Sequence, residues 1–429
     1  MEQTVLTQLQ WAAEMARGAK DYLFRSLAHN IGVDFLREAF KQIKPGKAPG
    51  IDGVTKKQYE TQLEENLATL HTRLKEQRYR APAVRRAWIP KIDGSRRPLG
   101  IPTLEDKIAQ GAVKMYLEAI YEQDFYDCSY GFRPGRSCHQ ALSKLRTHIS
   151  QGGMRYLIDA DIKQCFESFD HQQLQDLLKR RVIDGSIKRL VGKWLNAGVM
   201  DGNEVIFPEH GTPQGGVISP LLANIYLHYV LDEWIEQDVK SHCKGAIALV
   251  RYADDFIISC ELQSDAQRIM EVLPQRFAKY GLTIHPDKTQ LIDFTQPDTA
   301  DSKGTASFAF LGFRLFWAKS RQGYWVVKKA TDKQRLARTK KRIDDWCKRN
   351  RHAPVKQQHK VLSAKLKGHY NYYGVIGNYA RLAVVYNYAL QCWRKWLDRR
   401  GAKRRLTWER FLKLLDIFPL PTPRIVQAV

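Results

Sequence analysis

Two adjacent aspartates stand between two apolar runs near the middle of the chain, in the stretch LVRYADDFIIS, residues 249–259. The flanking runs IALVRY and FIIS favour β-structure, and together they predict two short strands joined by a tight turn. Asp254 and Asp255 are then expected at the tip of this hairpin. Aspartate is a good turn former because its carboxylate bonds nearby backbone N–H groups. Turn formation therefore explains the two adjacent aspartates as well as a cation site does. A third carboxylate close to them would favour the cation site.

A third carboxylate lies upstream, in the stretch YLIDADIKQCFESFDH, residues 156–171. A β-type run leads into Asp161 and a helical pattern follows. This predicts that Asp161 ends a strand and that a rigid element aims its side chain. Asp159 shares a strand face with Asp161, and Asp170 is a further alternative. A helix cap would explain one of these acids as readily as a cation site does, so the residues alone leave the choice open.

Length and composition bound the class of protein. The chain has 429 residues, of which 44% are hydrophobic, so it can bury a sizeable core and is expected to form two or three domains. Its seven cysteines form no C-x-x-C pair and no zinc-type spacing, which indicates reduced thiols in an intracellular protein. The amino-terminal stretch lacks the continuous apolar core of a secretory signal. Nowhere do about eighteen apolar residues run together, so we expect an intracellular protein without a membrane span.

The positive charge of the chain is concentrated toward its carboxyl end. The formal net charge is +24, and residues 319–429 contain 28 lysines and arginines against 6 aspartates and glutamates. Such an excess of positive charge in one part of the chain predicts a polyanionic partner, and nucleic acid is the polyanion that best fits it. The stretch KKATDKQRLARTKKRIDDWCKRNR, from Lys328, spaces its basic residues as a helix does. A solvated helix face is the alternative explanation of such a run.

Prolines and glycines, together with the spacing of apolar residues, divide the chain into three expected segments. Residues 1–60 are predicted to be helical and to end in the proline- and glycine-rich loop KPGKAPGIDGVT. Residues 61–318 alternate short β-rich runs with helical patterns, which is typical of an α+β domain. Residues 319–429 are predicted to contain one last strand and then three or four helices.

Both aspartate stretches belong to a longer series of motifs. YADD at residues 252–255 and DIKQCF at residues 161–166 resemble the palm of a reverse transcriptase, in particular of the group II intron-encoded reverse transcriptase and maturase family. The resemblance extends over almost the whole chain and keeps the family's order. The other similar stretches are RRAWIPKIDGSRRPLGIPTLEDKIAQ (85–110), YGFRPGRSCHQAL (130–142), GTPQGGVISPLLANIYLH (211–228), GLTIHPDKTQ (281–290), FAFLGFRL (308–315) and LKGHYNYYGV (366–375).

The resemblance implies a right-hand polymerase fold of class α+β. Fingers and palm would occupy residues 61–318, after an amino-terminal helical extension, and an α-helical thumb or maturase (X) domain would occupy residues 319–429. The implied substrates are an RNA template, a DNA primer and deoxynucleoside triphosphates, and a cognate intron RNA is an implied partner. Within the basic carboxyl-terminal segment we expect RNA contacts from Lys340, Lys341 and Arg342.

The resemblance also gives the carboxylates a role. It implies two Mg²⁺ ions, with Mn²⁺ as a substitute, that lie roughly 3.5–4 Å apart and stabilise the attacking and leaving oxygens of a phosphoryl transfer. Asp161, Asp254 and Asp255 would hold these ions, and the backbone of Ile162 would lie beside them. Repulsion between the paired aspartates is tolerable because the cations neutralise it. Lys288 matches the family lysine proposed to protonate the pyrophosphate leaving group.

Four further residues match positions at which the family meets the incoming nucleotide. Lys91 and Arg97 align with basic residues that bind the triphosphate, although Arg96 could take the role of its neighbour. Phe166 lies where the family places a ring beneath the 2′ carbon of the sugar. Gln214, on the glycine-flanked TPQGG loop, is expected to approach nucleotide and template. A basic hairpin tip that faces solvent is the alternative explanation of Lys91 and Arg97.

Two departures from the family pattern bear on function. Glu167 follows Cys165 and Phe166 where an aspartate is usual, and this change keeps the charge. The sequence ends at Val429 without the DNA-binding segment and the Cys/His-rich endonuclease of many relatives, so we expect the bacterial type that lacks an endonuclease domain.

Three classes of function follow from these observations. The first is an RNA-directed DNA polymerase of a mobile intron that also assists splicing as a maturase and takes part in retrohoming. The second is a domesticated relative that acts in DNA repair or phage defence. The third is an RNA-binding splicing factor alone, for which degraded aspartates are expected. All three aspartates are intact, which disfavours the third class.

Overall fold

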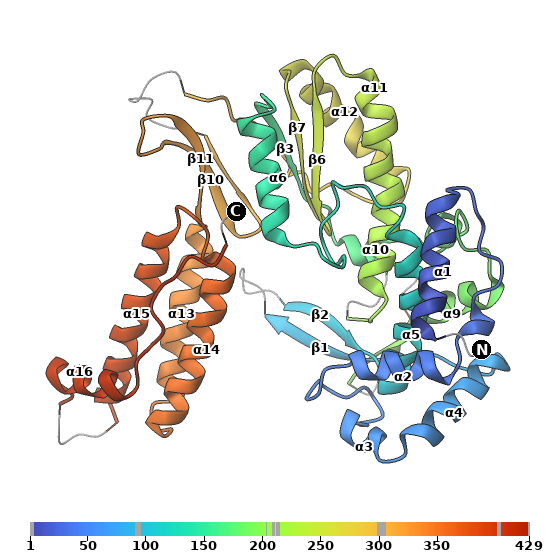
Figure 1. The fold of residues 1–429 in the computed structure, drawn as a ribbon, viewed down its shortest axis with the longest axis horizontal. Coiled ribbons are helices and arrows are strands. Elements are labelled where there is room, and N and C mark those ends of the chain that lie inside the picture. The colour runs from blue at the N-terminus through green and yellow to red at the C-terminus, as the bar shows by residue number, and fades with distance from the viewer. Residues whose placement is uncertain are drawn as a thin grey trace. The chain divides into compact units, whose positions relative to one another are not determined.

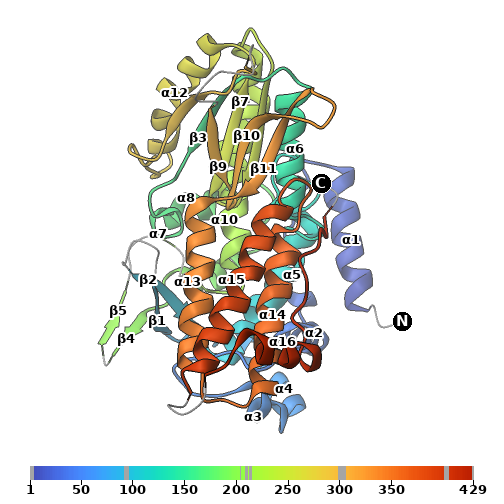
Figure 2. The same ribbon diagram turned by 90° about the vertical axis from the view of Figure 1, so that its left-hand side faces the viewer.

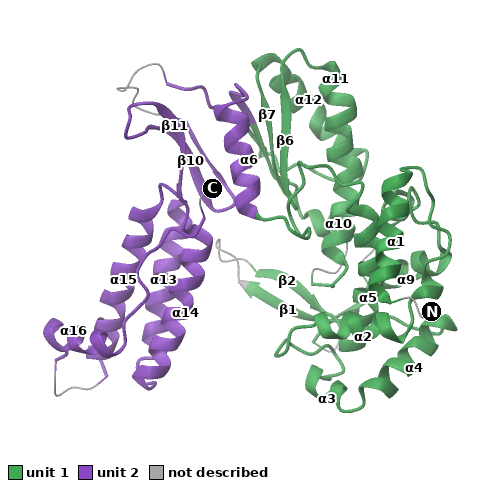
Figure 3. Cartoon of the chain, in the orientation of Figure 1, with its two compact units in different colours: residues 1–137, 158–291 green, residues 138–157, 292–429 purple. Residues whose placement is uncertain are grey.

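The computed structural model describes residues 4–90, 96–202, 204–207, 211, 215–297, 306–400 and 405–427. The chain forms two compact units, which Figure 3 distinguishes by colour. Unit 1 contains Met1–Ser137 and Ile158–Leu291, and unit 2 contains Cys138–Leu157 and Ile292–Val429. Each unit is therefore discontinuous in sequence. Within the described ranges, every helix is too short or too polar to cross a membrane.

The amino-terminal part of unit 1 is helical, as the sequence predicts (Figure 1). Helix α2 forms because Phe35, Leu36, Ala39 and Phe40 recur at helical spacing and bury one face. The loop that follows α2 has no helix or strand, in agreement with its prolines and glycines. The elements of this part are α1 (Val5–Gly18), the 3₁₀ turn η1 (Ala28–Asn30), α2 (Val33–Gln42), α3 (Lys56–Glu60) and α4 (Leu63–Lys75).

Helix α5 (Leu104–Tyr121) is the most buried long helix of unit 1, and α1 and α2 pack against it. It begins at Thr103, whose hydroxyl accepts a hydrogen bond from the backbone N–H of Asp106. Phe35 of α2 stacks on Tyr116 of α5, with ring centroids 4.8 Å apart. Unit 1 also contains α7 (Cys165–Ser168), α8 (His171–Leu178) and α9 (Gly185–Leu195).

A four-stranded sheet of order β2-β1-β4-β5 lies in unit 1. β1 and β2 pair antiparallel, with Arg85 opposite Ile101, and β1 pairs with β4 in parallel. The hairpin of β1 and β2 corresponds to the stretch that resembles polymerase fingers. The strands are β1 (Val84–Pro90), β2 (Arg96–Ile101), β4 (Val199–Asp201) and β5 (Glu204–Ile206).

A second four-stranded sheet, of order β6-β7-β3-β8, carries both aspartate stretches. β6 and β7 are buried almost throughout, as their continuous apolar runs predict. Helix α12 (Gln263–Ala278) contacts β7, and Figures 1 and 2 both show it beside this sheet. The strands are β3 (Tyr156–Ala160), β6 (Ile247–Tyr252), β7 (Asp255–Cys260) and β8 (Gln290–Asp293).

One long buried helix of unit 1 changes its winding along its length. It starts as α10 (Ser219–Leu227), continues as the π-helical segments η2 (His228–Asp232) and η3 (Trp234–Val239), and ends as α11 (Lys240–His242). π-Helix is rare, and it occurs most often as short insertions at functional sites.

Unit 2 combines one helix from the middle of the chain with the carboxyl-terminal region. Helix α6 (Cys138–Ser150) packs against β11 of a three-stranded antiparallel sheet of order β11-β10-β9. The boundary expected at residue 319 falls at the last residue of β10, and the sheet belongs with the helices that follow it. The strands are β9 (Ser307–Phe310), β10 (Phe313–Lys319) and β11 (Trp325–Thr331).

Four helices follow this sheet, in agreement with the predicted helical end of the chain. They share an apolar core to which Leu362, Leu366, Trp393 and Phe411 contribute fully buried side chains. The helices are α13 (Lys333–Arg349), α14 (Val355–Tyr373), α15 (Tyr379–Asp398) and α16 (Trp408–Ile417). The structure is thus of mixed α and β class, as expected.

Candidate active site

The YADD stretch forms the turn of the β6–β7 hairpin. Tyr252 pairs with Asp255 across the hairpin, which leaves Ala253 and Asp254 as a two-residue loop. Ala253 has a φ of 58°, in the left-handed region that costs a residue with a Cβ about 1–2 kcal/mol. Asp254 is half-buried and Asp255 is exposed. The predicted hairpin, with two carboxylates at its tip, is confirmed.

Gly131, in the YGFRPG stretch, lies directly against this turn. A Cβ at residue 131 would lie 2.3 Å from the backbone nitrogen of Ala253, so only glycine fits at this position. The neighbouring residue Tyr130 donates its N–H to the carbonyl of Arg251 at 2.8 Å. The YGFRPG stretch therefore begins as an extended segment bonded to the end of β6.

Asp161 directly follows the last residue of β3, as the sequence predicts. Its carbonyl accepts the N–H of His285 at 2.8 Å, and Ile162 forms a β-bridge with Ile284. The Asp161 side chain is 29% exposed, and its Oδ2 accepts a hydrogen bond from Lys288 Nζ at 2.6 Å. The structure therefore brings together three of the predicted site residues, Asp161, Ile162 and Lys288.

Asp161 lies close enough to Asp254 for its charge to act on the Asp254 carboxyl. Burial raises the pKa of Asp254, and the charge of Asp161 adds to this rise, whereas the charge of Arg97 opposes it. Burial also raises the pKa of the Cys165 thiol well above its usual value, and the charges of both aspartates contribute. The end of β3 and the tip of the hairpin thus share one region of negative charge, with Arg97 nearby.

The two other acids of the 156–171 stretch have different surroundings. Asp170 caps α8, because its carboxylate accepts the N–H of Gln173 at 2.7 Å. Asp159 lies within β3, where Gln290 donates to it at 3.4 Å and burial raises its pKa to about 6. Of the three aspartates in this stretch, Asp170 is therefore the one that caps a helix.

The chemistry of the carboxylates fits a magnesium site completed by substrate. Among the described residues, no three His, Cys, Asp or Glu side chains lie close enough together to enclose a metal ion. Mg²⁺ usually takes only one or two carboxylates and completes its shell with water and substrate phosphates. Asp161 and Asp254 supply these hard oxygen donors, and a cation between them would relieve their repulsion. Asp255 lies one residue along the same turn.

Phe166 lies on α7, a single helical turn that directly follows the Asp161 loop. Its side chain is 9% exposed, and its ring packs edge-on against Phe169 with centroids 6.1 Å apart. Gln164 enters this turn with a φ of 50°, so the chain reverses sharply between Asp161 and Phe166. The ring is therefore held by packing, and its expected role beneath the sugar of the nucleotide stays a prediction.

Two predicted nucleotide contacts, Lys91 and Gln214, lie outside the described residues. Arg97 is exposed on β2, and its charge reaches the hairpin aspartate. Gly215 has a φ of 114°, and a Cβ there would lie 2.4 Å from the carbonyl oxygen of Gly100 on β2. The absence of a side chain at this glycine therefore allows it to lie against the backbone of β2.

Sequence reasoning missed an ion pair directly behind the hairpin turn. Arg251 and Asp232 are both fully buried, with Nε 2.7 Å from Oδ1 and Nη2 2.5 Å from Oδ2. Arg251 also donates to the carbonyl of Ala253 at 3.1 Å. A signal was present in the sequence, because an arginine inside the apolar run IALVRY needs a buried partner or a strand edge.

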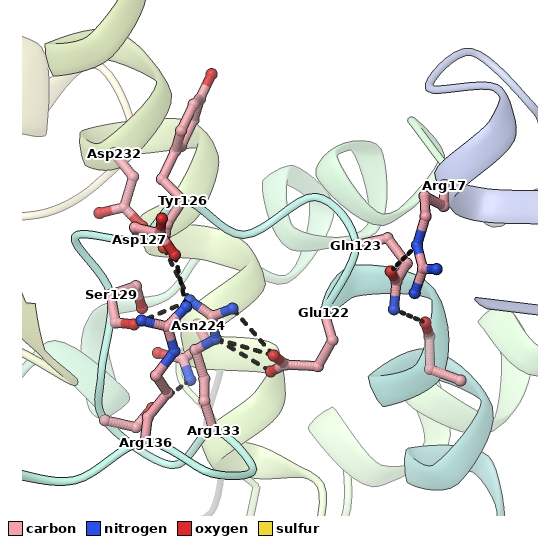
Figure 4. A network of polar contacts seen from close by, with 12 residues as sticks. Arg17, Glu122, Gln123, Tyr126, Asp127, Ser129, Arg133, Arg136, Asn224 and Asp232 are labelled. Atoms are coloured by element: carbon pink, nitrogen blue, oxygen red, sulfur yellow. Dashed lines mark hydrogen bonds and ion pairs between the residues drawn. The ribbon is translucent and has the colours of Figure 1, made fainter. Parts of the chain in front are cut away.

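A second buried arginine stabilises the loop beside the hairpin, and Figure 4 shows its contacts. Arg133 Nε lies 3.1 Å from both carboxylate oxygens of Glu122, and Nη2 lies 3.0 Å from one of them. Its Nη1 donates to the carbonyls of Tyr126 and Ser129 at 2.8 and 2.9 Å. These bonds fix the loop that leads from α5 to Gly131.

The basic carboxyl-terminal stretch forms α13, in unit 2. Lys341 and Arg342 are exposed, whereas Lys340 is half-buried and its Nζ lies 4.7 Å from the ring centroid of Tyr388. Burial lowers the pKa of Arg338, and the charge of Arg342 contributes. Of the three predicted RNA contacts, two are therefore available to a phosphate and one packs against an aromatic ring.

Comparisons with known proteins agree with this arrangement. Residues 89–315 match the family model described as reverse transcriptase (RNA-dependent DNA polymerase). Protein YkfC of Escherichia coli K12 is 32% identical over 65% of this chain and 79% of its own length. The group II intron-encoded protein LtrA of Lactococcus lactis subsp. cremoris is 40% identical over 48% of this chain and 34% of its own length. A 91 kDa protein in the cob intron of Schizosaccharomyces pombe is 44% identical over 42% of this chain and 22% of its own length.

Proposed function

The chain belongs to the group II intron reverse transcriptase and maturase family, and from this premise we propose that it extends a DNA primer on an RNA template at the β6–β7 hairpin. Its reverse transcriptase domain provides RNA-directed DNA polymerase activity. The observation that carries the choice of site is that Asp161, at the end of β3, and Asp254, at the tip of the β6–β7 hairpin, share one region of negative charge, in which the charge of Asp161 adds to the raised pKa of Asp254.

In this proposal the three aspartates hold the catalytic cations. Two Mg²⁺ ions, or Mn²⁺ in their place, would stabilise the attacking and leaving oxygens of the in-line displacement. Asp161 is aimed by the end of β3, Asp254 by the two-residue turn and Asp255 by the start of β7. These elements are rigid, so the carboxylates need little reorganisation before reaction.

Other residues bind and select the nucleotide. Arg97 places a guanidinium near Asp254, where it orients the triphosphate. Lys288 holds a proton beside Asp161, within reach of the site at which pyrophosphate leaves. Phe166 excludes a 2′-hydroxyl by steric overlap, which favours deoxynucleotides. Lys91 and Gln214 complete the nucleotide contacts in this proposal.

Unit 2 supplies the second part of the proposed function. Its basic helix α13 binds RNA phosphates through Lys341 and Arg342, and through Lys340 where that side chain leaves Tyr388. The match to this chain spans about a third of the Lactococcus intron-encoded protein. We therefore infer an intron RNA partner, a splicing role and a part in retrohoming from membership of the family. We place this activity in the cytoplasm, where intron transcripts are made in bacteria.

Primer extension tests the proposal. The purified protein is given poly(rA), a labelled oligo(dT) primer, dTTP and Mg²⁺, and Asp254→Asn and Asp161→Asn are compared with the parent. Each substitution removes a charged ligand and keeps the shape, so extension should fall at least about a hundredfold while thermal unfolding stays unchanged. Asp238→Asn, at an exposed aspartate of the same unit, is the matched control. Near-parental extension by either site variant would show that the cation site is wrong.

A further inference from the structure

The guanidinium of the fully buried Arg251 makes five hydrogen bonds, one of which reaches the hairpin turn. Its Nε and Nη2 bind Asp232, its Nη2 also donates to Ser129 Oγ at 2.9 Å, and its Nη1 donates to Asn224 Oδ1 at 2.9 Å. The fifth bond runs from Nη1 to the carbonyl of Ala253, at 3.1 Å. That carbonyl belongs to the peptide bond that joins Ala253 to Asp254. The guanidinium therefore holds the backbone from which the proposed cation ligand projects.

The preceding peptide bond, which joins Tyr252 to Ala253, is also confined. Asn224, which accepts from Arg251, donates its Nδ2 to the carbonyl of Gly131 at 2.7 Å. Gly131 in turn lies so close to the backbone of Ala253 that no Cβ fits between them. Ala253 is thus confined between Gly131 and the guanidinium, in a left-handed conformation that it would not adopt unaided.

The partner carboxylate is supplied by an unusual stretch of helix. Asp232 ends the π-helical segment η2, which continues α10. A π turn contains more residues than an α turn, so it rotates the side chains that follow it about the helix axis. The irregular winding affects the direction in which Asp232 projects, and Asp232 meets Arg251 with both oxygens. Such segments are retained mainly where a side chain must take a defined position.

Stability alone does not explain this arrangement. Removing two charges from water costs more than a typical ion pair returns, and replacing a buried pair by apolar side chains of similar size is often neutral or stabilising. Apolar residues in place of this ion pair would be expected to leave the fold about as stable. We therefore attribute the pair to a requirement for a defined backbone geometry. Here the geometry concerns a strained turn that carries a carboxylate.

We propose that Arg251 and Asp232 are positioning residues that fix the Ala253–Asp254 peptide, and with it the direction of the Asp254 carboxylate toward a bound divalent cation. The proposal rests on the function proposed above, in which Asp254 is a cation ligand. Neither residue of the pair touches the substrate. Their effect on the reaction passes through the backbone of the turn.

The test replaces the ion pair by apolar residues. Arg251→Met/Asp232→Leu leaves no unpaired charge, so its melting temperature should stay within a few degrees of the parent. Its kcat should nevertheless fall at least about tenfold, because a misplacement of an ångström can cost a hundredfold in rate. Mn²⁺ binding, followed by electron paramagnetic resonance without substrate, should weaken severalfold, and KM for dTTP should change less than kcat. Arg181→Met/Asp124→Leu is the matched control, since this pair is also buried in unit 1 and does not bond the turn.

The outcomes separate the two proposals. A stable double variant with parental kcat and parental Mn²⁺ affinity overturns the positioning role. If Asp254→Asn also leaves extension intact, the proposed function itself fails; if Asp254→Asn abolishes extension, only the positioning role fails. Should the double variant not fold, Asn224→Ala decides, because it keeps the ion pair and removes two bonds around the turn. It is expected to weaken Mn²⁺ binding while the protein stays folded, at a melting temperature lowered by a few degrees because buried hydrogen bonds are lost. Parental Mn²⁺ binding by this folded variant overturns the proposal.

Discussion

The ammonium nitrogen of Lys288 lies 2.6 Å from Oδ2 of Asp161, so the proposed proton donor and a proposed cation ligand form an ion pair. A cation that binds Asp161 through Oδ2 competes with Lys288 for this oxygen. Occupation of the site therefore frees the ammonium group for the substrate.

This competition predicts an unusual pair of effects for Lys288→Gln. Loss of the proton donor should lower kcat by about 10- to 100-fold, whereas loss of the competing charge should lower the Mg²⁺ concentration needed for half-maximal extension. Lys288→Arg keeps the charge and should retain the parental Mg²⁺ requirement. Single-turnover extension over a Mg²⁺ series measures both quantities. A parental kcat for Lys288→Gln contradicts the proton-donor role.

Phe166→Val should relax the choice of sugar. The smaller side chain leaves room for a 2′-hydroxyl, so the ratio of kcat/KM for dTTP over UTP should fall by about 10-fold or more. Phe166→Tyr keeps the ring and should keep the ratio. Incorporation of each nucleotide opposite the same template residue gives the measurement. An unchanged ratio in the valine variant would remove Phe166 from the nucleotide site.

Lys341→Gln/Arg342→Gln should weaken RNA binding in a salt-dependent way. Each phosphate contact that is lost flattens the slope of log affinity against log salt by about one unit. Adding Lys340→Gln should change the slope less, because this side chain packs on Tyr388. Lys244→Gln/Lys279→Gln, at exposed lysines of unit 1, is the control. A parental slope for the first variant would mean that α13 is only a solvated face.

Asp106 predicts a pH-dependent stability. Burial raises its pKa to about 6, while Tyr79 and Gln110 donate hydrogen bonds to its carboxylate. Because the folded-state pKa lies above the unfolded value, its contribution is fully present below about pH 4 and is lost as pH rises through 6. The free energy of unfolding of the parent should fall by about 2 kcal/mol relative to Asp106→Asn between pH 4.5 and 7.5. Urea unfolding across this range tests it, and a constant difference between the two proteins contradicts it.

The parts of the site that follow from local patterns were predictable from the sequence. Apolar runs beside paired acids gave the hairpin at Asp254, and a β-type run gave the strand end at Asp161. The ion pair of Arg251 with Asp232 was not predictable, because its partner is 19 residues away on a helix whose winding departs from the α pattern. Sequence spacing assumes regular helices, and π turns break that assumption.

The change in composition along the chain does not coincide with the boundaries of its two compact units. Composition changes near residue 319, yet the sheet of β9, β10 and β11 packs with the carboxyl-terminal helices and with α6. Contacts between residues so far apart in sequence depend on packing rather than on local composition. The expected fingers, palm and thumb segments remain a prediction about domains.

The discontinuity of unit 2 has a consequence for how the chain is synthesised. Residues 138–157 leave the ribosome well before the remainder of their unit, since the whole stretch Ile158–Leu291 of unit 1 is made in between. During that interval the apolar face of α6, with Ala141, Leu142 and Leu145, has no β11 to cover it. Domains usually fold as they emerge, and exposed apolar surface at that stage promotes aggregation. We therefore expect a nascent chain of this protein to expose this apolar face until β11 has left the ribosome.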